Sequence, residues 1–320
     1  MMQQGLSAFD LAVAKMKNVE SLLSSLFQIS IYMKNWYEIP LLYAGMKSEI
    51  VAKLAGGEEY RISGMEGYYI FRNCKFVPYY MKLKSGVDSS FKDGTLRLNA
   101  DGKGLIFRYG SQRELADILS ILYELFVDGE YSALEVLGRD VVDIGASFGD
   151  SAIYFSARGA KHVYAFELYP SSYALGVRNV AANSMKKRIT FLNEGCGPRS
   201  GSILIDPKQI STVFGKAKSA RKGKRVKIST LEGIVKRYKI GNGLLKVDCE
   251  GAEYEIILGA KDSTLKRFTQ MIIEYHHGYR DLVERLDAAG FECTHTMPRE
   301  MAGGAGERFE IGFIYASRVQ

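Results

Sequence analysis

The sequence predicts an α/β fold: a doubly wound, Rossmann-like seven-stranded sheet with a C-terminal antiparallel hairpin, preceded by an N-terminal helical and small β appendage. The first observation behind this is that near-continuous apolar runs alternate with helical segments after residue 131, as in a parallel sheet covered on both faces. The second is that shorter runs with turn signals occupy the preceding segment. We therefore expect an accessory region at residues 1–130 and the main domain at residues 131–320.

The accessory region divides by the spacing of its apolar residues. Helical spacing predicts helix over residues 6–54, with Pro40 as an interruption. Short β-like runs follow over residues 60–109, and the Asp101-Gly102 pair between the last two runs favours a hairpin. One apolar stripe predicts a helix over residues 113–127. The tyrosines of the β-like segment could form a substrate lid or a face between identical chains: Tyr68, Tyr69, Tyr79 and Tyr80.

The main domain contains five buried-type strand segments and then two more that could pair as a hairpin. No internal repeat or low-complexity tract interrupts them. The five segments are Asp140–Ile144, His162–Phe166, Ile189–Leu192, Leu244–Asp248 and Met271–Tyr275, and the last two are Phe291–Thr294 and Phe309–Tyr315.

The composition is that of an ordinary globular chain. Of its 320 residues, 47% are hydrophobic and 25% charged, which excludes disordered, collagen-like and coiled-coil proteins. The net charge of +7 could indicate nucleic acid, an anionic membrane surface or a phosphorylated substrate. Seven basic residues and no acid lie in the run Lys216–Lys227, which we expect to be a loop. Since this run accounts for the whole surplus, the charge is weak evidence for a globally basic surface.

The cysteines and the N-terminus indicate a cytoplasmic protein. The four cysteines lie far apart without zinc-ligand spacing, so reduced structural thiols are expected: Cys74, Cys196, Cys249 and Cys293. No basic segment and cleavage site typical of a signal peptide are present. The apolar stretch Leu22–Met33 is too short and too polar to cross a bilayer.

A glycine loop follows the first strand of the main domain. In the run Val141–Asp150, strand, loop and helix start place backbone N–H groups at the carboxyl edge of the sheet, where nucleotides bind in doubly wound folds. The dinucleotide pattern GxGxxG matches at only one of three glycines. The GxGxG loop of S-adenosylmethionine enzymes matches at two, Gly145 and Gly149. Asp143 and Asp150 suit a ligand with an ammonium and a sulfonium better than a pyrophosphate.

Glu167 lies at the end of the second strand, 24 residues after Asp143. A carboxylate there can accept hydrogen bonds from both ribose hydroxyls, in NAD and S-adenosylmethionine sites alike. The alternative is a solvated glutamate at a strand end.

Four ordered runs resemble the FkbM family of S-adenosylmethionine-dependent methyltransferases. They are VVDIGASFGD at 141–150, VYAFELYP at 163–170, LKVDCEGAE at 245–253 and IIEYH at 272–276, and the resemblance covers about residue 131 to the C-terminus. It implies a class I methyltransferase that methylates hydroxyl oxygens of sugars or polyketide-type molecules. The family usually has Asn where this chain has Ser147, a small residue that can still form a hydrogen bond.

The resemblance also implies roles for individual residues. The loop would wrap the methionine part of the cofactor, with Asp143 and Asp150 near its amino acid end and Glu167 at the ribose. Leu168 is a further candidate for binding the cofactor. Asn193 and Glu194 are weaker candidates for the adenine, and a plain polar loop is the alternative. The loop residues are Gly145, Ala146, Ser147, Phe148 and Gly149.

Transfer to oxygen needs a group that orients the acceptor and takes its proton. The ends of the fourth and fifth strands offer Asp248, Glu250, Glu274, His276 and the neighbouring His277. His276 could be the general base, with Asp248 orienting it or binding the cofactor. A divalent metal held by these carboxylates and His276 is a second hypothesis, and a purely structural His276 is a third.

Other functions remain open from the sequence. The Lys216–Lys227 run permits an RNA-binding protein or RNA methyltransferase, although it lacks the aromatics that stack on bases. The loop also contains a GxSxG string, which is typical of hydrolases, although the surrounding residues fit the methyltransferase pattern. A cofactor-binding protein without activity is a further alternative. We expect a hydroxyl-bearing small molecule or glycan as acceptor, and a homo-oligomer is compatible with the sequence.

Overall fold

The computed structural model describes residues 27, 29–31, 33–55, 57, 59–63, 88–92, 94–110, 112–207, 219–302 and 308–318. The chain divides into two compact units, Met1–Asp128 and Gly129–Gln320, and each is described by itself. Tyr68, Tyr69, Tyr79, Tyr80 and the first part of the basic run lie outside the described residues, so their predicted roles stay predictions.

The first unit contains short helices and small antiparallel sheets. Its helical elements are η1 (Trp36–Glu38), α2 (Ile39–Tyr43), α5 (Gln112–Tyr123) and the π-helical turn η2 (Glu124–Asp128). Strands β1 (Glu49–Lys53) and β2 (Glu59–Ser63) pair with each other, and β3 (Asp88–Lys92), β4 (Thr95–Ala100) and β5 (Lys103–Arg108) form a second sheet.

Two predictions for this unit can be compared with the structure. The Asp101-Gly102 hairpin is confirmed: β4 and β5 pair around these two residues, and both have positive φ. The predicted helix to about Leu54 is wrong over 49–53, which form β1. Ile50 and Ala52 alternate there with more exposed neighbours, because the strand buries one face against the rest of the unit.

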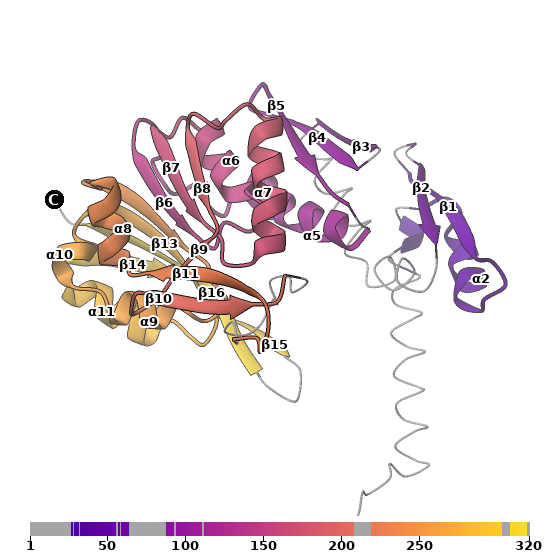
Figure 1. The fold of residues 1–320 in the computed structure, drawn as a ribbon. Coiled ribbons are helices and arrows are strands. Elements are labelled where there is room, and N and C mark those ends of the chain that lie inside the picture. Colours follow the sequence, from indigo (N-terminus) through magenta and orange to yellow (C-terminus); the bar gives the residue numbers. More distant parts are fainter. Residues whose placement is uncertain are drawn as a thin grey trace, which may run out of the picture. The chain divides into compact units, whose positions relative to one another are not determined.

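The second unit has the predicted doubly wound sheet. Its strand order is β14-β16-β13-β12-β6-β7-β8 (Figure 1). β15 pairs with the first four residues of β16. Strands β13, β12, β6, β7 and β8 are parallel, whereas β16 is antiparallel to β13 and β14. The strands are β6 (Asp140–Ile144), β7 (His162–Phe166), β8 (Ile189–Leu192), β12 (Gly243–Val247), β13 (Phe268–Tyr275), β14 (Phe291–His295), β15 (Arg299–Ala302) and β16 (Arg308–Arg318).

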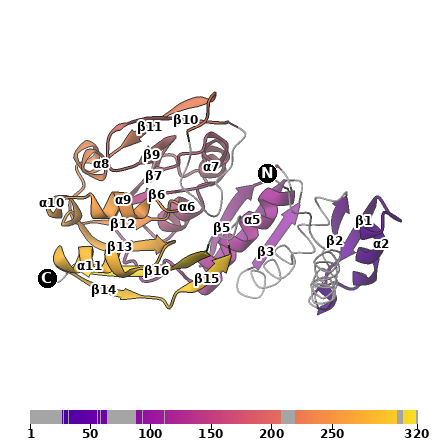
Figure 2. The same cartoon turned by 90° about the horizontal axis from the view of Figure 1, so that it is seen from below.

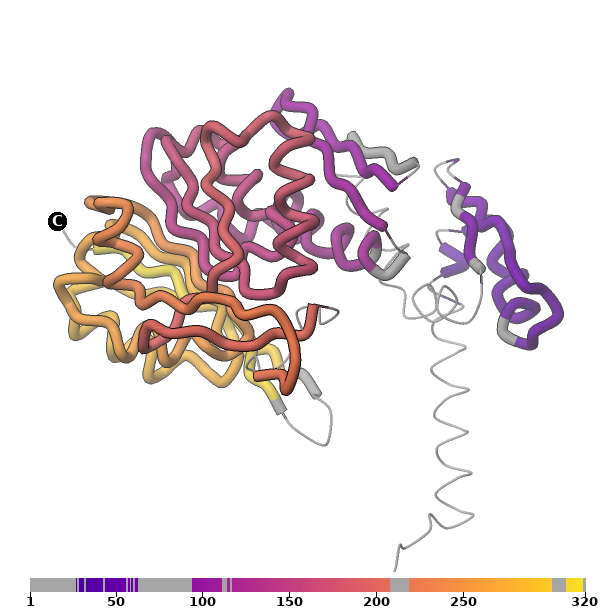
Figure 3. Tube along the Cα trace, in the orientation of Figure 1, coloured from indigo at the N-terminus to yellow at the C-terminus, as the bar shows by residue number. Residues whose placement is uncertain are grey.

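Helices cover both faces of this sheet (Figures 1 and 2). α6 (Asp150–Ala157) and α7 (Pro170–Ala182) follow β6 and β7 on one side, and α8 (Leu231–Tyr238), α9 (Glu253–Leu258), α10 (Asp262–Leu265) and α11 (Arg280–Ala288) belong to the second half of the unit. Buried side chains from α8, α9 and α11 pack on β12 and β13 in one core. The Cα trace in Figure 3 shows the two halves meeting, and they do so where β6 pairs with β12.

A small three-stranded sheet was not predicted. It consists of β9 (Glu194–Cys196), β10 (Gly201–Ile205) and β11 (Lys224–Ser229) in the order β10-β11-β9. The expectation that Lys216–Lys227 is a loop is therefore wrong for its last four residues, which are in β11. Val226 is buried between exposed basic neighbours, so period-two alternation hides a strand inside a run of charges.

Candidate active site

The glycine loop lies at the carboxyl end of β6, pressed against the end of β12. Gly145 has a φ of +84°, and a Cβ atom there would lie 1.6 Å from the Asp248 carbonyl oxygen, so only glycine fits. Ser147 and Gly149 also have positive φ, +43° and +83°. Ser147 occupies a left-handed conformation that Asn adopts more readily than Ser.

The loop is tied to the end of β7. The amides of Gly145 and Ala146 donate to the Phe166 carbonyl, and the Ser147 amide donates to Glu167 Oε2 at 2.8 Å. Glu167 Oε1 accepts from the Tyr169 amide at 2.7 Å. Burial raises the pKa of Glu167 to about 8, although these two amides oppose the shift. Glu167 is thus a buried carboxyl beside the loop, where a ribose was expected.

The two candidates for the adenine differ in their surroundings. Asn193 donates from Nδ2 to the carbonyls of Glu167 and Leu168, both at 3.0 Å, so it shapes the end of β7. The Glu194 carboxylate is already engaged by Arg237, Ser229 and Lys227. This arrangement favours a structural role for Glu194 in holding β9 to β11 and α8.

Beneath the loop lie two buried aspartates. Asp143 Oδ2 accepts from the Ser151 hydroxyl at 2.7 Å. Asp150 is the first residue of α6, and its buried Oδ1 has no hydrogen-bond partner among the residues that the structure describes. Burial raises the pKa of Asp150 to about 7. Phe148 contributes its carbonyl, which accepts from Asn179. An unsatisfied buried carboxylate oxygen beside a ligand loop is suited to a cationic group.

Lys246 is the main site residue that the sequence analysis missed. Its side chain is 2% exposed, and it lies in β12 directly opposite Asp143 of β6. The ammonium donates to the Gly145 carbonyl at 2.6 Å and lies 3.3 Å from Asp143 Oδ1 and 3.4 Å from Asp248 Oδ2. The available signal was a lysine in an otherwise apolar strand, because such a lysine must be paired in the fold.

The predicted catalytic residues come together at the ends of β12 and β13. Asp248 and Glu274 share a hydrogen bond, and burial raises the pKa of Glu274 well above its usual range, helped by the Asp248 charge. Burial alone would raise the pKa of Asp248, but the Lys246 ammonium and the bond from Glu274 hold it below its usual range. The two opposite shifts favour an ionised Asp248 and a proton on Glu274.

His276 is clamped between two glutamates. Its Nδ1 lies 3.0 Å from Glu253 Oε1, and its Nε2 lies 3.3 Å from Glu250 Oε2. Burial would lower the pKa of His276, but the two glutamates raise it to about 11. The imidazole thus holds a proton at neutral pH and has no free nitrogen to accept another. This geometry disfavours the base role that we predicted for His276.

Glu250 is better suited to accept a proton. Burial raises its pKa to about 7, and its side chain remains 23% exposed, more than those of Glu253 and His276. It has a φ of +57°, a strained conformation for a non-glycine residue, of the kind that is frequent at functional sites. A carboxylate that is half ionised near pH 7 and reachable from solvent meets the requirements for a general base.

Three of the predicted residues lie close enough together to bind a metal ion, but the charges around them do not favour a divalent cation. Ligand atoms of Asp248, Glu274 and His276 lie within 4.8 Å of one another. However, both His276 nitrogens lie within ion-pair distance of a glutamate oxygen, and the Lys246 ammonium next to Asp248 would repel a divalent cation. The negative charge of Asp248 and Glu274 is instead compensated by a proton on Glu274 and by the Lys246 ammonium.

An aromatic group borders the catalytic residues. The His277 ring lies 5.4 Å from the Phe309 ring and 5.9 Å from the Tyr254 ring, centroid to centroid. The His277 amide donates to the Tyr254 hydroxyl, which donates to the Gly278 carbonyl. His277 thus lies on the surface next to the clamp rather than inside it.

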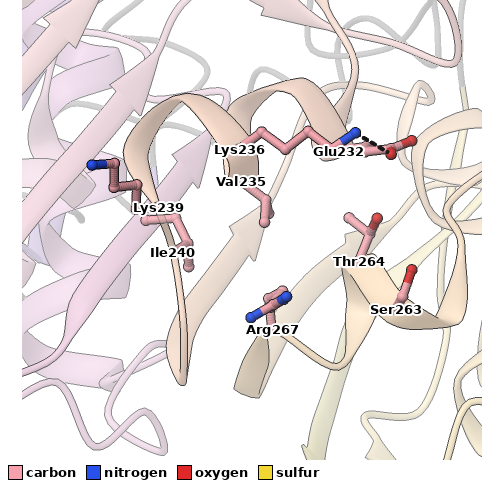
Figure 4. A pocket seen from close by; sticks show the side chains of 8 residues that line it. All are labelled: Glu232, Val235, Lys236, Lys239, Ile240, Ser263, Thr264 and Arg267. Carbon is pink, nitrogen blue, oxygen red and sulfur yellow. Dashed lines mark ion pairs between the residues drawn. The ribbon is translucent and has the colours of Figure 1, made fainter.

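A separate cavity of about 300 Å³ lies between α8 and α10 (Figure 4). Both helices precede the amino ends of their strands, β12 and β13, so the cavity is at the edge of the sheet opposite the glycine loop. Its lining residues are Glu232, Val235, Lys236, Lys239, Ile240, Ser263, Thr264 and Arg267. None of them is among the predicted site residues.

Comparisons with known proteins agree with the sequence motifs. Residues 143–293 match the model of the methyltransferase FkbM domain. The chain is 24% identical over 230 residues to methyltransferase sdnD of Sordaria araneosa, covering 60% of this chain and 87% of that protein. Within the described residues, no helix has the length and apolar character of a membrane span.

Solved structures of methyltransferases also resemble the chain. A precorrin-6y C5,15-methyltransferase from Geobacter metallireducens is 13% identical, with a TM-score of 0.35, over 60% of this chain and 87% of that one. The tRNA m1G37 methyltransferase of M. jannaschii is 13% identical, with a TM-score of 0.37, over 72% of this chain and 59% of that one.

Proposed function

We propose that this chain, which belongs to the FkbM methyltransferases through residues 143–293, transfers a methyl group from S-adenosylmethionine to a hydroxyl oxygen of a sugar, a glycan precursor or another small molecule. The observation that carries the proposal is the set of buried carboxyls around the glycine loop, Asp143, Asp150 and Glu167. Buried carboxyls suit a ligand that carries an ammonium and a sulfonium, and they would repel a pyrophosphate.

The residues present fit this cofactor. The unpaired Oδ1 of Asp150 offers an acceptor for an ammonium, and Glu167, fixed by the Ser147 and Tyr169 amides, offers acceptors for ribose hydroxyls. Gly145 to Gly149 would hold the methionine part, and Leu168 and Asn193 would border the nucleoside. When bound, S-adenosylmethionine supplies an electrophilic methyl group.

The chain's own residues would then handle the acceptor's proton. Glu250 takes the hydroxyl proton as the oxygen becomes nucleophilic. The His276 imidazolium, held by Glu253, keeps Glu250 in place and stabilises its ionised form. The Asp248–Glu274 pair orients the hydroxyl by accepting and donating hydrogen bonds. Positioning supplies much of the acceleration in such a displacement.

The basic run does not favour the RNA alternative. In its described part, Lys227 pairs with Glu194, and Lys224 lies 5.9 Å from the centroid of the Tyr173 ring, so both lysines, although exposed, already have partners within this unit. RNA binding by this chain can be tested directly. A salt-dependent gel shift with short RNA, lost when Arg221 and Lys222 are replaced by Ala, would support it.

The test of the proposal is methyl transfer from isotope-labelled S-adenosylmethionine to a panel of monosaccharides, sugar phosphates and small phenols. We expect labelled methyl ethers with the wild-type chain and none with Glu250→Gln. The exposed Glu284 of α11 provides the matched control, and Glu284→Gln should keep wild-type turnover. Label found only on nitrogen or carbon would overturn the assignment to oxygen.

A further inference from the structure

Among the residues that the structure describes, Lys246 is the one fully buried lysine or arginine. Neither the proposed cofactor contacts nor the proposed proton transfer assigns it a role. A buried ammonium is costly unless close partners compensate for its lost hydration. Lys246 has three such partners, and they come from the two strands on whose ends the site is built. Gly145 and Asp143 belong to β6 and its loop, and Asp248 follows β12.

The contact with Gly145 fixes the direction of a peptide in the loop. With the carbonyl of Gly145 bonded to Lys246, the amides of Gly145 and Ala146 donate to the Phe166 carbonyl. The next amide, that of Ser147, reaches Glu167. The ammonium therefore fixes the orientation of the peptide between Gly145 and Ala146. The next peptide carries the Ser147 amide, which donates to Glu167, the carboxyl proposed to bind the ribose.

The contact with Asp248 reaches the other end of the site. Asp248 lies 3.4 Å from the same ammonium, and its amide donates to the Ile144 carbonyl at 3.0 Å. Because its own carbonyl touches Gly145, the loop and the strand end cannot shift independently. Lys246 thus links, through one charged atom, the cofactor loop and the Asp248–Glu274 pair.

We propose that Lys246 is a positioning residue that couples cofactor binding to the ionisation of Asp248. The inference rests on the proposed function, since it assigns the loop to S-adenosylmethionine and Asp248 to the acceptor side. A bound cofactor that acts on the Gly145 peptide also acts on the ammonium bonded to it, and this ammonium is the cation beside Asp248. Cofactor binding at the glycine loop therefore changes the ionisation of Asp248 at the acceptor side of the site.

The experiment compares Lys246→Met, Lys246→Arg and the control Lys239→Met, in which an exposed lysine of similar size is lost. Loss of a charge-assisted hydrogen bond should weaken S-adenosylmethionine binding to Lys246→Met roughly 10- to 100-fold in calorimetry. Below the acid limb set by Glu250, a second acid limb set by Asp248 should move up by about one pH unit at saturating cofactor, because Asp248 loses a neighbouring cation. Lys246→Arg should restore the position of that limb, and Lys239→Met should match wild type.

Lys246→Met with a lowered melting temperature but wild-type affinity and pH profile would overturn the inference, because Lys246 would then only stabilise the fold. A wild-type chain that does not bind the cofactor would instead overturn the proposed function. If the Met variant does not fold, proton–nitrogen NMR of wild-type protein with isotope-labelled lysine decides. We expect one slowly exchanging ammonium signal that shifts when cofactor is added, and a signal unmoved by cofactor would contradict the coupling.

Discussion

The pKa of Glu167 predicts a steep pH dependence of cofactor binding. Burial raises this pKa to about 8. A carboxyl that accepts hydrogen bonds from two ribose hydroxyls must be ionised. With a pKa near 8, the ionised fraction is roughly 1% at pH 6, 10% at pH 7 and 90% at pH 9. If only the ionised form binds, the apparent Kd should fall about tenfold between pH 7 and pH 9, or about 1.4 kcal/mol.

The raised pKa of Glu167 also determines how the stability of the folded chain depends on pH. Because the folded-state pKa of Glu167 is raised, folding without cofactor is favoured below its unfolded value of about 4.5, and this contribution is lost as the pH rises through about 8. Cofactor affinity runs in the opposite direction and increases over the upper part of that range.

Calorimetry of S-adenosylmethionine binding at pH 6, 7, 8 and 9 measures the effect. Glu167→Gln, which cannot ionise, should bind weakly with little pH dependence, and Glu284→Gln should follow the wild-type curve. An affinity that is constant from pH 6 to pH 9 in the wild type, or a Glu167→Gln variant as tight as wild type, would show that Glu167 does not bind the ribose.

Three further predictions concern the catalytic end of the site. Glu250→Gln should lower kcat about 100-fold or more with unchanged cofactor affinity and remove the acid limb near pH 7, and turnover assays that show the limb intact would exclude Glu250 as base. His276→Ala should leave Glu250 and Glu253 without their shared cation and lower stability by about 3 kcal/mol in urea unfolding, and a variant as stable as wild type would contradict the clamp. EDTA should leave turnover unchanged, whereas activity lost with EDTA and restored by Mg²⁺ would revive the metal hypothesis.

The fold was predictable from the sequence to a large extent because the sheet of the second unit is buried on both faces. Runs such as Val141–Ile144 and Leu244–Val247 are buried at every position and apolar at all but one, a pattern that indicates strands covered on both faces when helical segments separate the runs. β9 to β11 escaped prediction because β11 is half exposed and its outward residues are lysines and arginine, which obscure the alternation around Val226. β1 was misassigned as helix since its five residues follow a helical segment with few turn signals.

The candidate site was partly predictable for a related reason. Residues at the carboxyl ends of parallel strands must meet, so the motifs located Asp143, Asp248 and His276 near one another. The protonation states could not be predicted, because they depend on which side chains meet. His276 is paired with Glu250 and Glu253 through a turn with positive φ at Glu250, and no spacing rule predicts that. Lys246 was missed because its importance arises from cross-strand pairing with Asp143.

Binding of the two nucleotide classes tests the central claim most directly. Calorimetry of the intact chain at pH 8 should show S-adenosylmethionine binding at one site, with S-adenosylhomocysteine weaker because it lacks the sulfonium charge that the buried carboxyls favour. NAD should give no heat above dilution. Tight binding of NAD together with no binding of S-adenosylmethionine would contradict the account.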